Sequence, residues 1–231
     1  MRRTSTDQQH DSPERRDSAA GGRRARARQE RYDAVFAAAI ALFVERGYDG
    51  TTMEAIADRA GVARASVFNY FPRKQAILAE WAARRRQLVR DLAEARQAGK
   101  PAQPSGPPGP SGPSAPSIEM ALFAYMDAWA EVNERTREET AACGMAALRE
   151  TDLLTSSGLS RELEAYIDAA ASRGETRPGL DARLAGMSLA AGYFAVLATW
   201  IGAGPGRCDL HGELRKLTEL HLEGMLPRGR S

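Results

Sequence analysis

The residues best suited to chemistry lie in the segment 51–74, and they are of the kinds that contact DNA. The guanidinium of Arg64 can bind O6 and N7 of guanine in the major groove. Ala65 and Ser66 follow directly and would meet base edges or thymine methyl groups. Hydroxyl and ammonium groups near helix starts commonly bind phosphate. That role is expected for Thr51, Thr52 and Lys74.

Two short helices joined by a tight turn are expected to position these residues. Thr51 and Glu54 form the T-x-x-E pattern of a capping box at a helix start. Gly61 can take the left-handed backbone conformation that often ends a helix, and a second helix should begin near Ala63. Its outward face would be short and mixed, as in a helix that reads the major groove. The same spacing also fits an ordinary helical hairpin in an all-α protein.

The amino-acid sequence of this segment resembles that of a known family. GVARASVFNYFPRKQAIL is similar to the recognition-helix signature of TetR-type transcriptional repressors, and the similarity continues upstream through ALFVERGYDGTTMEAIADRAGV. It covers about Arg31 to Leu78. The resemblance implies an all-α protein with an N-terminal three-helix helix-turn-helix domain, followed by a helical effector-binding and dimerisation domain.

The resemblance also implies roles for the aromatic-rich run Phe68, Asn69 and Tyr70. In such proteins the first two of these positions lie against the DNA backbone. Phe68 stands where the family usually has Tyr, so a phosphate-contacting hydroxyl is lost. Ala63 stands where the family usually has a capping Ser, which would leave the start of the reading helix less firm.

Charge is unevenly distributed along the chain. Residues 1–117 carry 20 Lys and Arg against 13 Asp and Glu, and residues 118–231 carry 12 against 17. A basic first half and an acidic second half fit a nucleic-acid reader joined to another domain. An uneven but merely solvated surface would look the same.

The sequence offers little for catalysis, metals or export. There is no phosphate-binding glycine loop, nucleophile elbow or zinc spacing, and three histidines leave little for acid–base work. Two cysteines provide neither a disulfide framework nor a metal site. We therefore expect no enzyme activity, no metal and no cofactor. The start of the chain lacks the apolar region of a secretory signal, so a cytoplasmic, nucleoid-associated protein is expected.

Composition suggests five segments. Residues 1–28 are polar and Arg-rich and should form a disordered basic arm, which either reaches DNA or serves as a solubilising tail. The helix-turn-helix domain is expected over 29–78, with its first helix starting near Gln29. A connecting helix should continue over 79–98, where Leu88 would face inward and the run Arg84–Arg86 would be solvated. Residues 99–117 hold seven of the 12 prolines and should form a linker. A helical ligand-binding and dimerisation domain follows over 118–226.

Two residue sets are expected to carry the function of this last domain. Apolar residues that would line an effector pocket, or would simply be core, are Met126, Trp129, Met145, Tyr166, Phe194 and Trp200. Residues on the last two helices that would pair two copies of the chain in a four-helix bundle are Gly186, Ala190, Leu210, Leu214, Leu217 and His221.

The uncharged run 184–204 also has the length of a membrane span. Its many Ala and Gly residues fit a helix buried on all sides better. Three hypotheses follow from these observations. The chain is a ligand-responsive repressor that binds a palindromic operator as a homodimer, a helical architectural or partner-binding protein, or a membrane-anchored regulator. We favour the first, with double-stranded DNA, a second copy and an unknown small molecule as partners.

Overall fold

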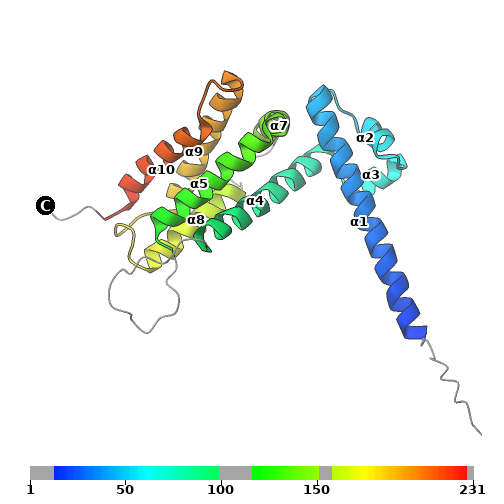
Figure 1. Cartoon of the computed structure of the whole chain (residues 1–231), viewed down its shortest axis with the longest axis horizontal. Coiled ribbons are helices and arrows are strands. Elements are labelled where there is room, and N and C mark those ends of the chain that lie inside the picture. The colour runs from blue at the N-terminus through cyan, green and yellow to red at the C-terminus, as the bar shows by residue number, and fades with distance from the viewer. Residues whose placement is uncertain (1–12, 99–115, 151–157, 228–231) are drawn as a thin grey trace, which may run out of the picture. The chain divides into compact units, whose positions relative to one another are not determined.

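A computed structural model describes residues 13–98, 116–150 and 158–227 (Figure 1). In these ranges all regular structure is helical, which confirms the all-α prediction. The chain divides into two compact units, one up to Arg73 and one from Lys74 onward. The expected linker falls almost entirely outside the described residues.

The first unit is built from three helices: α1 (Pro13–Arg46), α2 (Met53–Ala60) and α3 (Arg64–Tyr70). Its core is the apolar stripe of α1 packed against one face each of α2 and α3. Among the buried side chains are Val35, Leu42, Phe43, Ile56, Val67 and Phe71. This is the three-helix arrangement that the sequence predicts.

The first helix is longer than expected. It begins at Pro13 rather than near Gln29, so residues 13–28, expected to be disordered, are helical. Ala and Arg are among the strongest helix formers, and they dominate residues 19–28. A segment with few apolar residues cannot form a hydrophobic core of its own. Residues 13–28 need none, because they extend the part of α1 that already packs against α2 and α3.

The second unit contains α4 (Lys74–Ala98), α5 (Ile118–Arg135), α6 (Arg137–Glu139), the π-helical turn η1 (Thr140–Gly144) and α7 (Met145–Glu150). It is completed by α8 (Gly158–Ser172), α9 (Ala182–Ala203) and α10 (Leu210–Met225). Figure 1 shows α5 running along α4 and α10. The core of the second unit joins α5 to α8, α9 and α10. Its fully buried side chains include Leu122, Tyr125, Leu163, Leu189 and Leu214.

Two expectations for α4 are wrong. Leu88, expected to face inward, is 46% exposed. Arg85, expected to be solvated as part of a charge run, is only 6% exposed. Both lie on the expected helix, but the inward face is set by the neighbouring helices, which include polar groups that bind Arg85.

Candidate nucleic-acid interface and cavity

A side-chain cap and a left-handed glycine define α2 within the helix-turn-helix. The hydroxyl of Thr52 accepts a hydrogen bond from the N–H of Ala55 at 3.1 Å. Gly61 has φ 65° and ψ 33°, the left-handed conformation expected of it. The N–H of Val62 then donates to the carbonyl of Ala57, which closes the turn.

Thr51 does not have the predicted role. It is 1% exposed, and its hydroxyl donates to the carbonyl of Gly47 at 2.8 Å, inside the first unit. A side chain in this position holds the end of α1 against the start of α2 and does not face phosphate. The cap that the T-x-x-E pattern assigned to Thr51 belongs to the next residue, Thr52, which is exposed.

The recognition helix α3 presents most of the predicted DNA-binding residues to solvent. Its exposed members are Arg64, Ala65, Phe68 and Asn69, while Ser66 and Tyr70 are half-buried and Val67 is fully buried. The guanidinium of Arg64 lies 5.5 Å from the centre of the Phe68 ring. This arrangement places a donor and an aromatic face side by side on one surface.

The start of α3 carries no side-chain cap. Ala63 occupies the N-cap position and makes no hydrogen bond through its side chain. The other end is held by aromatic contacts, since the ring of Tyr32 on α1 lies 4.8 Å from that of Phe71 and 5.8 Å from that of Tyr70. The helix is therefore anchored mainly at its C-terminal end.

A basic groove runs between α1 and the C-terminal end of α3, and we did not predict it from the sequence. It is lined by Arg24, Arg28 and Arg31 from α1 and by Ser66, Asn69 and Tyr70 from α3. The signal was available, because spacings of four and three residues place three side chains on one face of a helix. It was missed because this segment was expected to be disordered.

Lys74 is the first residue of α4 and opens the second unit. Its expected contact with phosphate therefore remains a prediction.

The second unit encloses a cavity between α4, α5, α7, α8 and α9. Its volume is about 40 Å³. The lining residues are Trp81, Ala82, Arg85, Arg86, Trp129, Asn133, Gly144, Ala147, Leu159, Tyr193, Phe194 and Leu197. The walls are thus mainly apolar, with two arginines on α4.

The cavity contains only part of the predicted pocket set. Trp129 and Phe194 line it. Met126 and Trp200 are buried in packing contacts, and Met145 is 37% exposed. Tyr166 packs against Tyr125 at 5.3 Å between ring centres. Apolar character did not separate wall residues from core residues, and the polar wall residues were not predicted.

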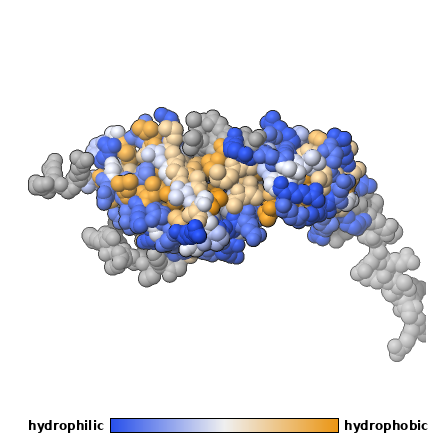
Figure 2. Space-filling model, turned by 90° about the horizontal axis from the view of Figure 1, so that it is seen from above, coloured by the Kyte–Doolittle hydropathy of each residue, from blue (hydrophilic) through white to orange (hydrophobic). Residues whose placement is uncertain are grey.

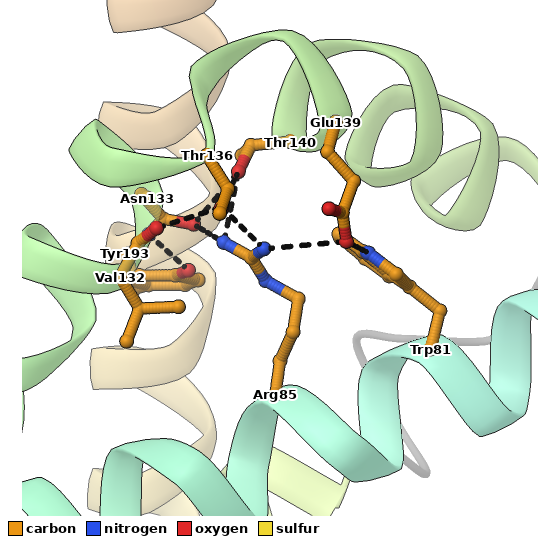
Figure 3. A network of polar contacts seen from close by, with 8 residues as sticks. All are labelled: Trp81, Arg85, Val132, Asn133, Thr136, Glu139, Thr140 and Tyr193. Atoms are coloured by element: carbon orange, nitrogen blue, oxygen red, sulfur yellow. Dashed lines mark hydrogen bonds and ion pairs between the residues drawn. The ribbon is translucent and has the colours of Figure 1, made fainter. Parts of the chain in front are cut away.

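Arg85 is the centre of a buried polar network (Figure 3). Its Nη2 donates to Oδ1 of Asn133 at 2.7 Å and to Oγ1 of Thr140 at 2.8 Å, and its Nη1 donates to Oγ1 of Thr136 at 2.7 Å. Asn133 in turn donates to the hydroxyl of Tyr193 at 2.9 Å. These bonds connect α4 to α5, η1 and α9.

Burial affects the ionisable groups of this network. Removal from water lowers the pKa of the Arg85 guanidinium from its usual value. Burial raises the pKa of Tyr193 to about 12, so its hydroxyl keeps its proton at neutral pH. The network therefore contains one buried cation and neutral partners in direct contact with it.

The six residues predicted to form a dimer interface are engaged within the subunit. Leu210, Leu214 and Ala190 are fully buried in the core. Gly186 lies against the backbone of α8, since an added Cβ would come within 2.7 Å of the N atom of Glu164. These four residues therefore do not form the predicted interface.

The remaining two members of that set pack between α9 and α10. An added Cβ on Gly192 would come within 2.6 Å of Leu217, so Leu217 covers α9 at this point. His221 Nε2 lies 3.2 Å from the hydroxyl of Ser188. An amphipathic stripe shows that one face of a helix is buried, but not what buries it. In α10 this face packs against other helices of the same subunit.

A different face of α9 and α10 stays exposed and partly apolar. Leu184 is 51% exposed and Leu220 is 66% exposed, and both line a groove that also includes Ala185 and Ser188. Apolar residues gather at the surface of the second unit in Figure 2. In the part of the chain that the structure describes, α9 is the one helix long and apolar enough to cross a membrane, and a third of its most apolar window is buried.

No group of three His, Cys, Asp or Glu side chains that could hold a metal ion occurs among the described residues. The two cysteines, Cys143 and Cys208, are free. Burial is the main cause that raises the pKa of the Cys143 thiol to about 12, which leaves it a poor nucleophile.

The helix-turn-helix domain and the fold as a whole both resemble those of known proteins. Residues 35–81 match the model of bacterial regulatory proteins of the tetR family. The HTH-type transcriptional regulator RutR of Escherichia coli K12 is 39% identical over 56 residues, which cover 24% of this chain and 26% of RutR. The alignment thus spans about a quarter of the length of that curated relative.

Solved structures extend the similarity to most of the chain. FadR of Thermus thermophilus, a TetR-family repressor solved with lauroyl-CoA, is 27% identical with a TM-score of 0.59, and the match covers 86% of this chain and 97% of FadR. FadR of Bacillus subtilis, solved with stearoyl-CoA, has a TM-score of 0.62 at 21% identity, over 84% of this chain and 98% of that one. At that identity it shows the fold alone. Residues 35–81 therefore match the DNA-binding domain of the TetR family, and the chain as a whole has the fold of TetR-family regulators.

Proposed function

We propose that the protein is a repressor that binds a palindromic operator as a homodimer and is released from it by a small molecule. The observation that carries this proposal is the surface of α3. Arg64, Ala65, Phe68 and Asn69 are exposed on a helix that the buried Val67 anchors to the rest of the domain. No enzymatic activity is proposed, and the protein acts in the cytoplasm.

DNA is read and held by two adjoining surfaces. Arg64 contacts guanine in the major groove, where a bidentate guanidinium discriminates one base pair. The groove of Arg24, Arg28 and Arg31 binds the phosphate backbone beside it, because phosphate contacts set the position of a reader but carry no base information. The helical form of this segment makes it a fixed contact rather than a flexible arm.

Two copies pair through α9 and α10. Of the residues first expected there, His221 lines the same groove as Leu184 and Leu220, whereas the four that pack inside the subunit do not contribute. The exposed side chains Leu184 and Leu220 support a face on which a second copy packs about a twofold axis. Only a third of the most apolar part of α9 is buried within one subunit. A dimer covers the rest, and its two readers bind the two halves of a palindrome.

A membrane anchor is a poorer account of α9. Its other face holds Leu189, Tyr193 and Leu197 in the core against neighbouring helices. Wrapping α9 in lipid would remove these side chains from the core, whereas pairing with a second copy leaves them in place.

The effector binds in the cavity of the second unit. Ligand pockets are commonly concave and mostly apolar with a few placed polar groups, and this cavity has such a composition. The space open to water is small, so an effector must displace side chains such as Phe194 to enter. FadR of Thermus thermophilus, which matches most of this chain, was solved with lauroyl-CoA, which supports a ligand with an apolar portion.

The proposal is tested by capturing DNA with the full chain. Immobilised protein is mixed with sheared DNA from its source organism, and the retained fragments are sequenced. Enrichment of a few fragments that share an inverted repeat is expected. Even coverage of the genome would contradict sequence-specific binding, and enrichment that disappears in the Arg64→Ala variant would assign it to α3.

A further inference from the structure

The cavity of the second unit carries an excess of positive charge at one wall. Arg85 and Arg86 both line it from α4. The nearest carboxylates are Glu139, whose Oε1 lies 3.8 Å from Nη1 of Arg85, and Glu162, whose Oε1 lies 3.6 Å from Nε of Arg86. Both separations exceed ordinary hydrogen-bond distance.

Each of these carboxylates is also engaged elsewhere. Glu139 accepts the indole N–H of Trp81 at 2.5 Å. Glu162 is bound by Arg90 and by the hydroxyl of Tyr125. Three guanidinium groups therefore share two carboxylates in this region, so each arginine has a carboxylate nearby but the five groups carry one net positive charge.

Of the two arginines that line the cavity, Arg85 would gain more from a bound anion than Arg86. Its hydrogen bonds go to neutral side chains, those of Asn133, Thr136 and Thr140. Its Nε is buried and has no hydrogen-bond partner among the described residues. A buried guanidinium whose carboxylate partner lies 3.8 Å away is incompletely neutralised, and an anion in direct contact would offset the cost of burying its charge.

The rest of the cavity has the opposite character. Trp129, Leu159, Phe194 and Leu197 form apolar walls. These side chains favour an apolar body and offer no carboxylate to a cationic ligand. The two arginines and the apolar walls together define an amphipathic site.

We propose, on the basis of the function proposed above, that the effector is an amphipathic anion whose acidic group binds at Arg85 and whose apolar body lies against Trp129 and Phe194. The acidic group adds a charged acceptor to the Arg85 network and neutralises the excess charge of this wall. Neutral and cationic molecules with the same apolar body bind more weakly. A cation is rejected because it would meet Arg85 and Arg86 at close range.

The test compares three probes that differ only in their head group: decanoate, decanol and decylamine. Binding to the full chain is measured by isothermal titration calorimetry and by tryptophan fluorescence, because Trp81 and Trp129 line the cavity. Decanoate is expected to bind at least about tenfold more tightly than decanol, as for a hydrogen bond to a charged group, and decylamine most weakly. Equal binding of decanoate and decanol, tightest binding of decylamine, or no binding of decanoate overturns the inference.

Two variants locate the preference. Arg85→Gln should remove most of the difference between decanoate and decanol, whereas Arg84→Gln, a change in the adjacent arginine that forms an exposed pair with Glu80, should preserve it. A preference unchanged in Arg85→Gln overturns the assignment to Arg85. If Arg85→Gln fails to fold, the comparison of the three probes on the unmodified chain still decides.

The proposed repressor function is tested separately, by identifying the DNA fragments that the full chain retains. If decanol binds as tightly as decanoate and releases this DNA, the repressor function stands and the anion inference fails. If the chain retains no DNA but prefers decanoate through Arg85, the anion site stands and the repressor function fails.

Discussion

Arg64 at the start of α3 forms an ion pair with Glu54 of α2, with 2.5 Å between Nη2 and Oε1. Both side chains are largely exposed, so water screens the pair and it contributes little to stability. The proposed bidentate contact with guanine would compete with Glu54 for Nη2 of Arg64.

This relationship predicts opposite effects of two substitutions. Arg64→Ala should weaken binding to the preferred duplex by about 1–3 kcal/mol for each base pair that the guanidinium reads. Glu54→Ala frees the guanidinium and removes a negative charge near DNA, so affinity should stay equal or rise. Fluorescence anisotropy with a labelled duplex measures both. A loss of affinity in Glu54→Ala similar to that in Arg64→Ala would show that the pair itself is needed.

The basic groove predicts a second, sequence-independent effect. Replacing Arg24 and Arg28 by Ala should weaken binding to every duplex and reduce the slope of log K against log salt by roughly one for each phosphate that is no longer neutralised. Arg46→Ala, at the other end of α1, is the matched control. Titrations at several salt concentrations give the slopes. An unchanged slope in the double variant would place the groove away from DNA.

Glycines in α9 predict a contrast in stability. At Gly186 a Cβ would lie 2.7 Å from the N atom of Glu164 and 2.9 Å from the carbonyl O of Ser160, and both are backbone atoms of α8. Gly186→Ala should therefore force α8 and α9 apart and cost about 1–3 kcal/mol. Gly202 has no atom within 4 Å of an added Cβ, so Gly202→Ala should keep or raise stability by up to about 1 kcal/mol. Urea unfolding followed by circular dichroism measures both. If Gly186→Ala is as stable as the parent, the close packing of the two helices is wrong.

The dimer face predicts a change of mass in solution. Leu220→Glu places a charge where a second copy would bury it, so association should weaken by several kcal/mol. Leu88→Glu changes another exposed leucine, on α4, and should leave the dimer intact. Light scattering without detergent gives the masses. A monomeric parent, or a dimeric Leu220→Glu variant, would contradict the proposed face.

The sequence predicted the reader well because local signals there agree with each other. Gly61 has the expected left-handed backbone, and Val67 is buried while its neighbours Arg64 and Asn69 are exposed. Turn chemistry and helical period suffice for such features, since they depend on residues close in the chain. Thr51 was misassigned because it alone completes the T-x-x-E pattern with Glu54, but either of the two adjacent threonines can cap a helix, and the tertiary fold selected Thr52.

The second unit was harder because its site depends on long-range contacts. Arg85 lies within a run of three arginines, and only the fold shows that Asn133 and Thr140 meet it while Arg84 stays exposed. Likewise, Leu214 and Leu220 are both leucines of α10, but one is core and the other surface. Periodicity identifies an apolar stripe without identifying what packs on it.

Reading of DNA by a dimer through α3 can be tested by selecting bound duplexes from a random pool with the parent and with Arg64→Ala. The parent is expected to enrich an inverted repeat, and Arg64→Ala to relax the choice at the same base pair in both halves. An enriched sequence without twofold symmetry, or a selected sequence that Arg64→Ala leaves unchanged, would contradict the claim that a dimer reads DNA through α3.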